Sequence, residues 1–475
     1  MQNITTTSTT PSQAPPFGDG SPRPPLPEQP PVRGRGRSTP AGSLRDRIAR
    51  HWQEPRVIAI DVARALAIIG MIGAHAGASY VFDAGDPSTW SAVVHGRSSI
   101  LFAVVAGISV AFVTARAREA SVEQLRAIRL GLVGRGAAVF TIGVLMELLN
   151  APISVVLTTY GLVFVAVIPF ITWSRRRLLV AAAVGAVVCP PVLALFADAG
   201  LGEGAAAAVA LVGGYPVTEW LVLVFVGMVV GRSALNARTG VVLIAVGAVL
   251  AGAGYGVGAL AVPDHPALGQ SDSITSISSG EEGSVGPLGP VPADQLDLEG
   301  ELCTDDLGAI TCTSADDSGN ETFHVPTVLD LFDAGHLEAA GAALVDPSPH
   351  STGTAEIVGS GGVALAVIGL CLLVARPLRW VVWPLAALGS CSLTAYVLHA
   401  VGLSAWASAT EAGWVDIGSG TPVWSSIWTG LLVAATIWSL LVGRGPLERL
   451  VGAAADRMAL RSRGREAPAQ AGPAS

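Results

Sequence analysis

The sequence contains no lysine: all 28 of its basic residues are arginine, and charged residues make up only 13% of the 475-residue chain. Soluble domains carry about 25% charged residues, so this composition argues against a soluble globular protein. Cysteine is also scarce, with five residues, and no cysteine or histidine group has the spacing of a metal site. We therefore expect no metal. The first 55 residues lack a short apolar region with a small-residue cleavage site, so we expect no cleaved signal peptide.

Apolar residues are abundant instead: 51% of the chain is hydrophobic and the mean hydropathy is +0.55. They occur in blocks of about 20 residues, the length that crosses a bilayer. The sequence therefore predicts an all-α, polytopic integral membrane helix bundle of about ten transmembrane helices. We place these at 57–78, 96–115, 129–149, 153–173, 178–198, 216–235, 240–262, 355–375, 380–403 and 424–443.

The arginines set the expected orientation. They occur in the N-terminal tail, in every second connection and in the C-terminal tail, whereas Pro263–Gly353 holds 17 acidic residues and no arginine. Because positively charged connections stay in the cytoplasm, we expect a multi-pass protein of the cell membrane with both termini cytoplasmic and the acidic segment outside. The net charge of −8 comes from that segment, and we expect no nucleic-acid partner.

These spans divide the chain into five parts. The expected parts are a disordered Pro-rich tail (1–55), spans one to seven (56–262), a long irregular extracytoplasmic loop (263–353), spans eight to ten (354–449) and an Arg-rich cytoplasmic tail (450–475). Within the first tail, 43–52 is either a short interfacial helix or a solvated linker helix. In the outer loop, Cys303 and Cys312 lie in an oxidising compartment and are predicted to form a disulfide.

The first span carries three groups that lipid disfavours. In "DVARALAIIGMIGAHAGA", Asp61, Arg64 and His75 fall on one helical stripe, and Arg64 and His75 are separated by about 16 Å along the axis. Intramembrane charges cost at least about 2.5 kcal/mol each and usually face an interior cavity. We therefore expect Arg64 and His75 to project into one shared polar pocket. Two other interpretations stay open: a structural Asp61–Arg64 ion pair, and a simple interhelical hydrogen bond of His75.

Other spans place polar residues at matching depths. Arg135 joins Arg64 in the cytoplasmic half, and a second set is expected near the outer face, where it would line the acceptor side: His95, Arg97, Glu147, Glu219, Tyr396 and His399. Residues sorted by depth suggest a chamber with two different ends. Histidine is the usual proton acceptor for a hydroxyl or amine that attacks an acyl group. Arginines facing the cytoplasm suit a donor that carries phosphate groups.

Several segments resemble known membrane proteins. "RVIAIDVARALAIIGMIGAHAG" and "HGRSSILFAVVAGISVAF" resemble the opening of heparan-α-glucosaminide N-acetyltransferase-like proteins. These and later segments, such as "GYPVTEWLVLVFVGMVVGR" and "LGSCSLTAYVLHA", also resemble YeiB-like bacterial proteins. The spacing of Arg64 and His75 matches the arginine–histidine signature of the third acyltransferase family of membrane proteins.

The resemblance implies a transmembrane acyltransferase. Such an enzyme passes an acyl group, here expected to be acetyl, from cytoplasmic acyl-CoA to an extracytoplasmic carbohydrate or cell-envelope acceptor; the chain would lie in the lipid bilayer, and a homodimer is compatible with it. His75 is the expected catalytic base, and Arg64, Arg135 and Asp61 would bind the donor. The sequence departs from the N-acetyltransferases in its first outer loop, "SYVFDAGDPSTW", which lacks their histidine.

Two rival classes fit the same outline. A transporter or flippase of a polar envelope precursor would also place a polar chamber among ten spans, although we find no convincing internal repeat. A catalytically inactive scaffold would use the same ion pairs only for packing.

Overall fold

A computed structural model of the chain describes residues 58–76, 85–149, 153–198, 215–261, 301–306, 309–314, 334–411 and 421–464. The chain divides into two units, 1–52 and 53–475, and every described residue belongs to the second. The predicted N-terminal tail, including 43–52, therefore lies outside the described residues, as do residues 465–475 of the predicted C-terminal tail; residues 450–464 of that tail are described and are helical.

Seven helices in the described part are long and apolar enough to cross a membrane. The helix Val122–Glu147, for example, has 26 residues and begins with a capping box. The Ser121 side chain accepts the backbone N–H of Gln124, and the Gln124 side chain accepts the backbone N–H of Ser121. The seven are α2 (Ile58–His75), α3 (Arg97–Val113, preceded by the 3₁₀ helix η1, Pro87–Val94), α4 (Val122–Glu147), α6 (Arg175–Asp198), α9 (Ala237–Ala261), α11 (Thr354–Val374) and α14 (Thr421–Leu441).

The other three predicted spans are shorter or broken. α12 (Trp383–Ser390) and α13 (Ser392–Glu411) form one segment that bends by 82°. α5 (Leu157–Ala166), followed by η2 (Ile168–Phe170), and α8 (Val217–Gly231) are apolar helices of 10 and 15 residues. Each predicted span therefore contains a helix, and the all-α membrane fold is confirmed; by length alone, seven helices span, or eight with the bent pair.

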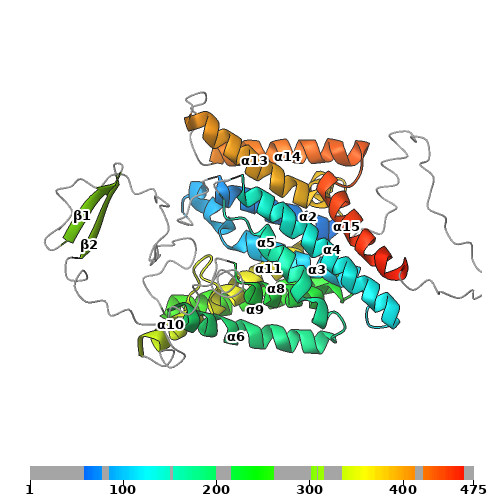
Figure 1. The fold of residues 1–475 in the computed structure, drawn as a ribbon, viewed down its shortest axis with the longest axis horizontal. Coiled ribbons are helices and arrows are strands. Elements are labelled where there is room, and N and C mark those ends of the chain that lie inside the picture. The colour runs from blue at the N-terminus through cyan, green and yellow to red at the C-terminus, as the bar shows by residue number, and fades with distance from the viewer. Residues whose placement is uncertain are drawn as a thin grey trace, which may run out of the picture. The chain divides into compact units, whose positions relative to one another are not determined.

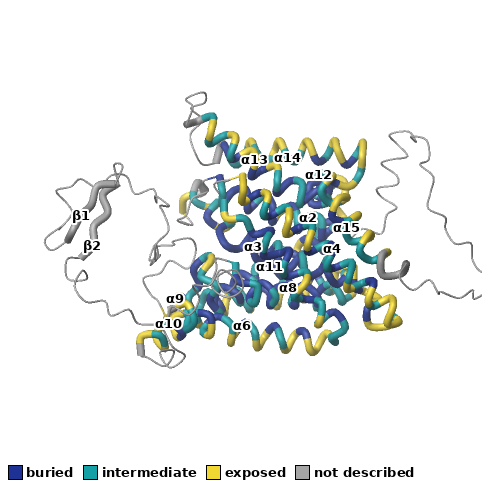
Figure 2. Tube along the Cα trace, in the orientation of Figure 1, coloured by how far each residue is buried: buried dark blue, intermediate teal, exposed yellow. Residues whose placement is uncertain are grey.

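Glycines allow the central helices to pack closely (Figure 1). α3 meets α8 where a Cβ on Gly107 would lie 2.9 Å from the Cα of Gly227. α9 meets α11 in the same way, since a Cβ on Gly254 would lie 2.5 Å from the backbone nitrogen of Gly359. Small residues at such crossings are typical of membrane bundles. In Figure 2, α2, α3, α8 and α11 are largely buried, whereas α6, α9 and α14 expose apolar residues, as lipid-facing helices do.

The two ends of the bundle carry different helices. α15 (Pro446–Gly464) packs on the first half of α4, where a Cβ on Gly134 would meet the carbonyl of Ala454 at 2.7 Å. α10 (Ala334–Val345) packs on α6 and leads into the start of α11. We call these the α15 end and the α10 end. The acidic segment between α9 and α11 is therefore not irregular throughout, because it contains α10 and a hairpin of β1 (Glu301–Asp306) and β2 (Ala309–Ser314).

The hairpin bears on the predicted disulfide. β1 and β2 are antiparallel, and Cys303 is the register partner of Cys312. Opposed Cα atoms in such a pair lie about 4.5–5.5 Å apart, within the range of about 4.4–6.8 Å that a disulfide accepts. We expect neither cysteine to react with an alkylating reagent until a reductant is added, as read by mass spectrometry of the peptide released by cleavage after Glu301 and Glu321. Alkylation of both before reduction would contradict the disulfide.

Candidate functional site

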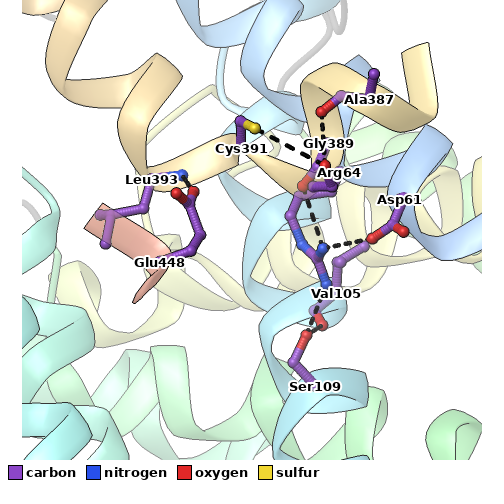
Figure 3. A network of polar contacts seen from close by, with 10 residues as sticks. Asp61, Arg64, Val105, Ser109, Ala387, Gly389, Cys391, Leu393 and Glu448 are labelled. Carbon is purple, nitrogen blue, oxygen red and sulfur yellow. Dashed lines mark hydrogen bonds and ion pairs between the residues drawn. The ribbon is translucent and has the colours of Figure 1, made fainter. Parts of the chain in front are cut away.

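Arg64 ties three helices together (Figure 3). One terminal nitrogen of its guanidinium donates to Asp61 Oδ1 at 2.7 Å and to the carbonyl of Gly389 in α12 at 3.2 Å. The other donates to Ser109 Oγ in α3 at 2.9 Å. The spacing of Asp61 and Arg64, one turn apart, produces the ion pair directly. Arg64 is thus a clamp between α2, α3 and α12, as the structural interpretation of the ion pair predicts.

A cavity of about 340 Å³ adjoins this clamp, and we call it the Arg64 cavity. Arg64 and Arg135, the two predicted donor residues, both line it. Its walls are mostly apolar and aromatic, with Phe102, Phe164 and Tyr160 among them. The cavity therefore has mostly apolar walls that also carry two guanidinium groups and the carboxylate of Glu448.

A larger cavity of about 790 Å³ lies between α4 and α15, and we call it the Arg116 cavity. Three arginines line it, namely Arg116, Arg135 and Arg444. Arg135, Phe112 and Val113 line both cavities, so the two adjoin. The Nε of Arg135 is buried and has no hydrogen-bond partner among the described residues, and its guanidinium carbon lies 6.0 Å from the ring centroid of Phe164. Arg135 can therefore accept an anionic ligand.

Glu448 of α15 closes one wall of the Arg64 cavity. Its carboxylate accepts hydrogen bonds from the backbone nitrogens of Leu393 and Thr394, at 2.7 and 3.2 Å, and from the Thr394 hydroxyl at 2.7 Å. These are the free N–H groups at the start of α13, which a carboxylate satisfies well. Glu448 thereby fixes the bend between α12 and α13 (Figure 3).

His75 and His399 form a pair at the other end of α2. His75 Nδ1 lies 3.1 Å from His399 Nε2, and the two rings are nearly parallel, with an interplanar angle of 3° and ring centroids 5.4 Å apart. His399 is 1% exposed, and Tyr396 meets it edge to face at 5.1 Å. The structure thus brings together three predicted site residues from two spans, and the hydrogen bond fixes the orientation of the His75 ring.

Within the described residues, a buried apolar layer lies between Arg64 and His75. His75 does not line the Arg64 cavity, and the residues between them on the stripe, Ile68 and Met71, are 0% and 5% exposed. The expectation of one open chamber is therefore not met. The physical reason is that the stripe between the two polar groups is apolar and packs into the core.

A chain of contacts links the Arg64 cavity to the histidine pair. Leu157 lines the Arg64 cavity, and its neighbour Val156 donates its backbone N–H to the Tyr396 hydroxyl at 3.4 Å. Tyr396 in turn contacts His399. The start of α5 therefore connects the wall of the Arg64 cavity with the histidine pair through Tyr396.

The remaining predicted residues lie elsewhere. His95 and Arg97 are buried at the α10 end, and Arg97 Nε donates to the Tyr255 hydroxyl at 2.8 Å. Glu219 is buried as well, beside the loop that precedes α11. Glu147 is exposed at the last residue of α4, so the structure does not bring it to the others.

Several residues of these clusters were not predicted from the sequence. Ser109 and Glu448 belong to the Arg64 clamp and cavity, and Glu356 holds the loop 350–352 through its carboxylate. Glu356 gave a usable signal, since it stands in the first turn of a span in which lipid penalises charge. Ser109 gave none, because serine is common in membrane helices.

Two families match the chain. Residues 56–249 match heparan-alpha-glucosaminide N-acetyltransferase, catalytic, and residues 339–456 match a family described as protein of unknown function (DUF418). No curated protein and no solved structure matches. The two matched regions build the sites jointly: Arg64 comes from the first and Glu448 from the second, and the hydrogen bond of His75 crosses to His399 in the second.

Proposed function

We propose that this chain, which belongs to the heparan-α-glucosaminide N-acetyltransferase-like and YeiB-like family of membrane proteins, transfers an acyl group from cytoplasmic acyl-CoA to a carbohydrate or other acceptor of the cell envelope. One observation supports this most strongly. A basic cavity at the α15 end adjoins an apolar one, and contacts through Val156 and Tyr396 link that second cavity to a hydrogen-bonded histidine pair.

The donor would enter at the α15 end. Acyl-CoA carries phosphate groups at one end and the thioester on a long arm at the other. Guanidinium groups bind phosphate through paired hydrogen bonds, so Arg116, Arg135 and Arg444 suit the nucleotide end. The Arg64 cavity suits the arm. Arg64 already donates to three partners on α2, α12 and α3. It would therefore chiefly hold these helices in place around the cavity, while Arg135 binds the donor.

His75 would act as the general base. Only one hydrogen can lie between its Nδ1 and His399 Nε2. When His75 supplies that hydrogen, its Nε2 is unprotonated and can accept a proton. The acceptor hydroxyl or amine would lose its proton to Nε2 as its oxygen or nitrogen bonds to the thioester carbonyl carbon. The carbon–sulfur bond then breaks, and the proton passes to the departing thiolate of CoA.

The proposed orientation puts the α15 end in the cytoplasm. Arg232 donates to the carbonyls of Ile171 and Trp173, at 2.8 and 2.5 Å, so two arginine-bearing connections meet at one end of the bundle. Positively charged connections gather on the cytoplasmic side. The histidine pair would then face the outside, where the acceptor is.

The test uses the purified full-length protein in lipid nanodiscs. Acetyl-CoA labelled in its acetyl group is supplied together with candidate envelope glycans. We expect release of CoA and transfer of label to one acceptor. No binding of any acyl-CoA, measured by thermal shift over a range of chain lengths, would rule the function out.

A transporter or flippase has one observation in its favour. The bend between α12 and α13 resembles the broken helices that build transporter sites. An inverted repeat would place a matching broken helix in the other half, and the described residues contain one bent pair. Uptake of a labelled envelope precursor into proteoliposomes without acyl-CoA would favour this function.

A further inference from the structure

Glu219 is a buried carboxylate without a donor. Its side chain, in the first turn of α8, is 3% exposed, and neither carboxylate oxygen has a hydrogen-bond partner among the described residues. The hydroxyl of Thr352 is a polar neighbour, but its hydrogen goes to the carbonyl of Ser351 at 2.7 Å. Burying an unpaired carboxylate is so costly that such a group takes up a cation or a proton.

A small cavity of about 20 Å³ lies beside this carboxylate. Among its lining residues, Glu219 and Glu356 carry carboxylates and Ser99 and Thr352 carry hydroxyls, while Ile100, Leu223 and other apolar side chains form the rest of the wall. The Ser99 hydroxyl donates to the carbonyl of Gly96 at 2.6 Å, so neither hydroxyl has a hydrogen left for the cavity. The volume suffices for one particle the size of a water molecule.

The loop that forms one wall is held in an uncommon conformation. His350 and Thr352 have φ angles of 66° and 58°, which residues other than glycine rarely adopt. Glu356 holds them there, because its carboxylate accepts the backbone N–H groups of His350 and Thr352, both at 2.8 Å. Such strain persists where the surrounding structure requires it and often marks a functional site. His350 is exposed, so the cavity lies near the surface of the α10 end.

We propose that this cavity binds a small monovalent cation, with Na⁺ as the fitting ion. Hard cations take oxygen ligands, and the wall supplies carboxylate and hydroxyl oxygens. Glu356 is already satisfied by its loop, so a single positive charge balances Glu219. A protonated Glu219 beside a water molecule is the competing arrangement, and the infrared measurement below distinguishes it from the bound ion. The ion would join α3, α8 and the loop before α11, independently of any acyl transfer.

The experiment measures the apparent Tm of the full-length protein in nanodiscs, in NaCl and in choline chloride at equal ionic strength. We expect Na⁺ to raise the Tm of the wild type by about 2–4 °C in a saturable way. In Glu219→Gln the amide supplies its own donors, so the Na⁺ effect should vanish without loss of stability in choline. Glu147→Gln, which neutralises an exposed carboxylate on α4, should keep the full Na⁺ effect.

Three results would overturn the site. The first is an equal Tm of the wild type in Na⁺ and choline, and the second is a Na⁺ effect that survives Glu219→Gln. The third is an infrared band of a protonated carboxyl group at neutral pH in NaCl that disappears in the variant. If Glu219→Gln does not fold, binding of radiolabelled Na⁺ to the wild type decides: saturable binding supports the site, and its absence overturns it.

Discussion

His75→Asn should abolish acyl transfer while leaving the fold and donor binding intact. Asparagine places its amide nitrogen where the imidazole holds Nδ1, so the contact with His399 Nε2, 3.1 Å long in the wild type, can persist. It has no group that accepts a proton near neutral pH. General base catalysis contributes about 10²–10⁴ in rate, so we expect a loss of that size in turnover of labelled acetyl-CoA.

The control is the partner histidine. His399→Gln can still accept the His75 Nδ1–H hydrogen bond, through its side-chain oxygen, but loses the imidazole ring. Because His399 orients the base rather than contacting the substrate, we expect a smaller loss of rate and a changed pH profile, with acyl-CoA affinity unaltered. Wild-type turnover in His75→Asn would remove His75 from the mechanism, whereas loss of acyl-CoA binding in that variant would show that the residue serves the fold or the donor site.

The helices and the ion pair of α2 follow from local sequence. Each bilayer crossing needs a long apolar block, so the ten blocks could be read directly. Asp61 and Arg64 stand one turn apart, and their contact at 2.7 Å depends on helical geometry alone. The sequence also predicts that Arg64 and Arg135 lie together, because both stand in the same half of their spans, and both line one cavity.

Contacts between distant segments could not be predicted in this way. His75 and His399 are 324 positions apart, and only the packing of α13 against α2 brings them together. The bend between α12 and α13, at Cys391, is held by Glu448. This residue accepts the backbone N–H of Leu393, although it lies 55 positions further along the chain. The shared pocket of Arg64 and His75 was predicted wrongly for a related reason. The sequence of α2 does not reveal whether neighbouring helices pack against Ile68 and Met71, which lie between the two polar residues.

Arg64→Ala should destabilise the bundle severely, whereas Arg135→Ala should not. Removal of Arg64 leaves the Asp61 carboxylate, whose side chain is 16% exposed, without its partner. It also leaves the Gly389 carbonyl without its hydrogen bond. The backbones of α12 and α2 pack closely here, since a Cβ on Gly389 would clash with the backbone of Asp61. Removing one partner of a buried ion pair costs about 3–5 kcal/mol. We expect poor yield and a much lowered apparent Tm.

Arg135 is different because its Nε has no partner to lose. Arg135→Ala should therefore keep its Tm but bind acyl-CoA about 10–100-fold more weakly, as expected for a charged hydrogen bond worth about 1.5–3 kcal/mol. The double variant Asp61→Ala/Arg64→Ala separates the two functions of Arg64. If Arg64 is a clamp, the double variant is more stable than Arg64→Ala alone, since no carboxylate is left unpaired. If Arg64→Ala instead keeps the wild-type Tm and loses only acyl-CoA, then its guanidinium contacts the donor directly, and the bonds to Gly389 and Ser109 contribute little to stability.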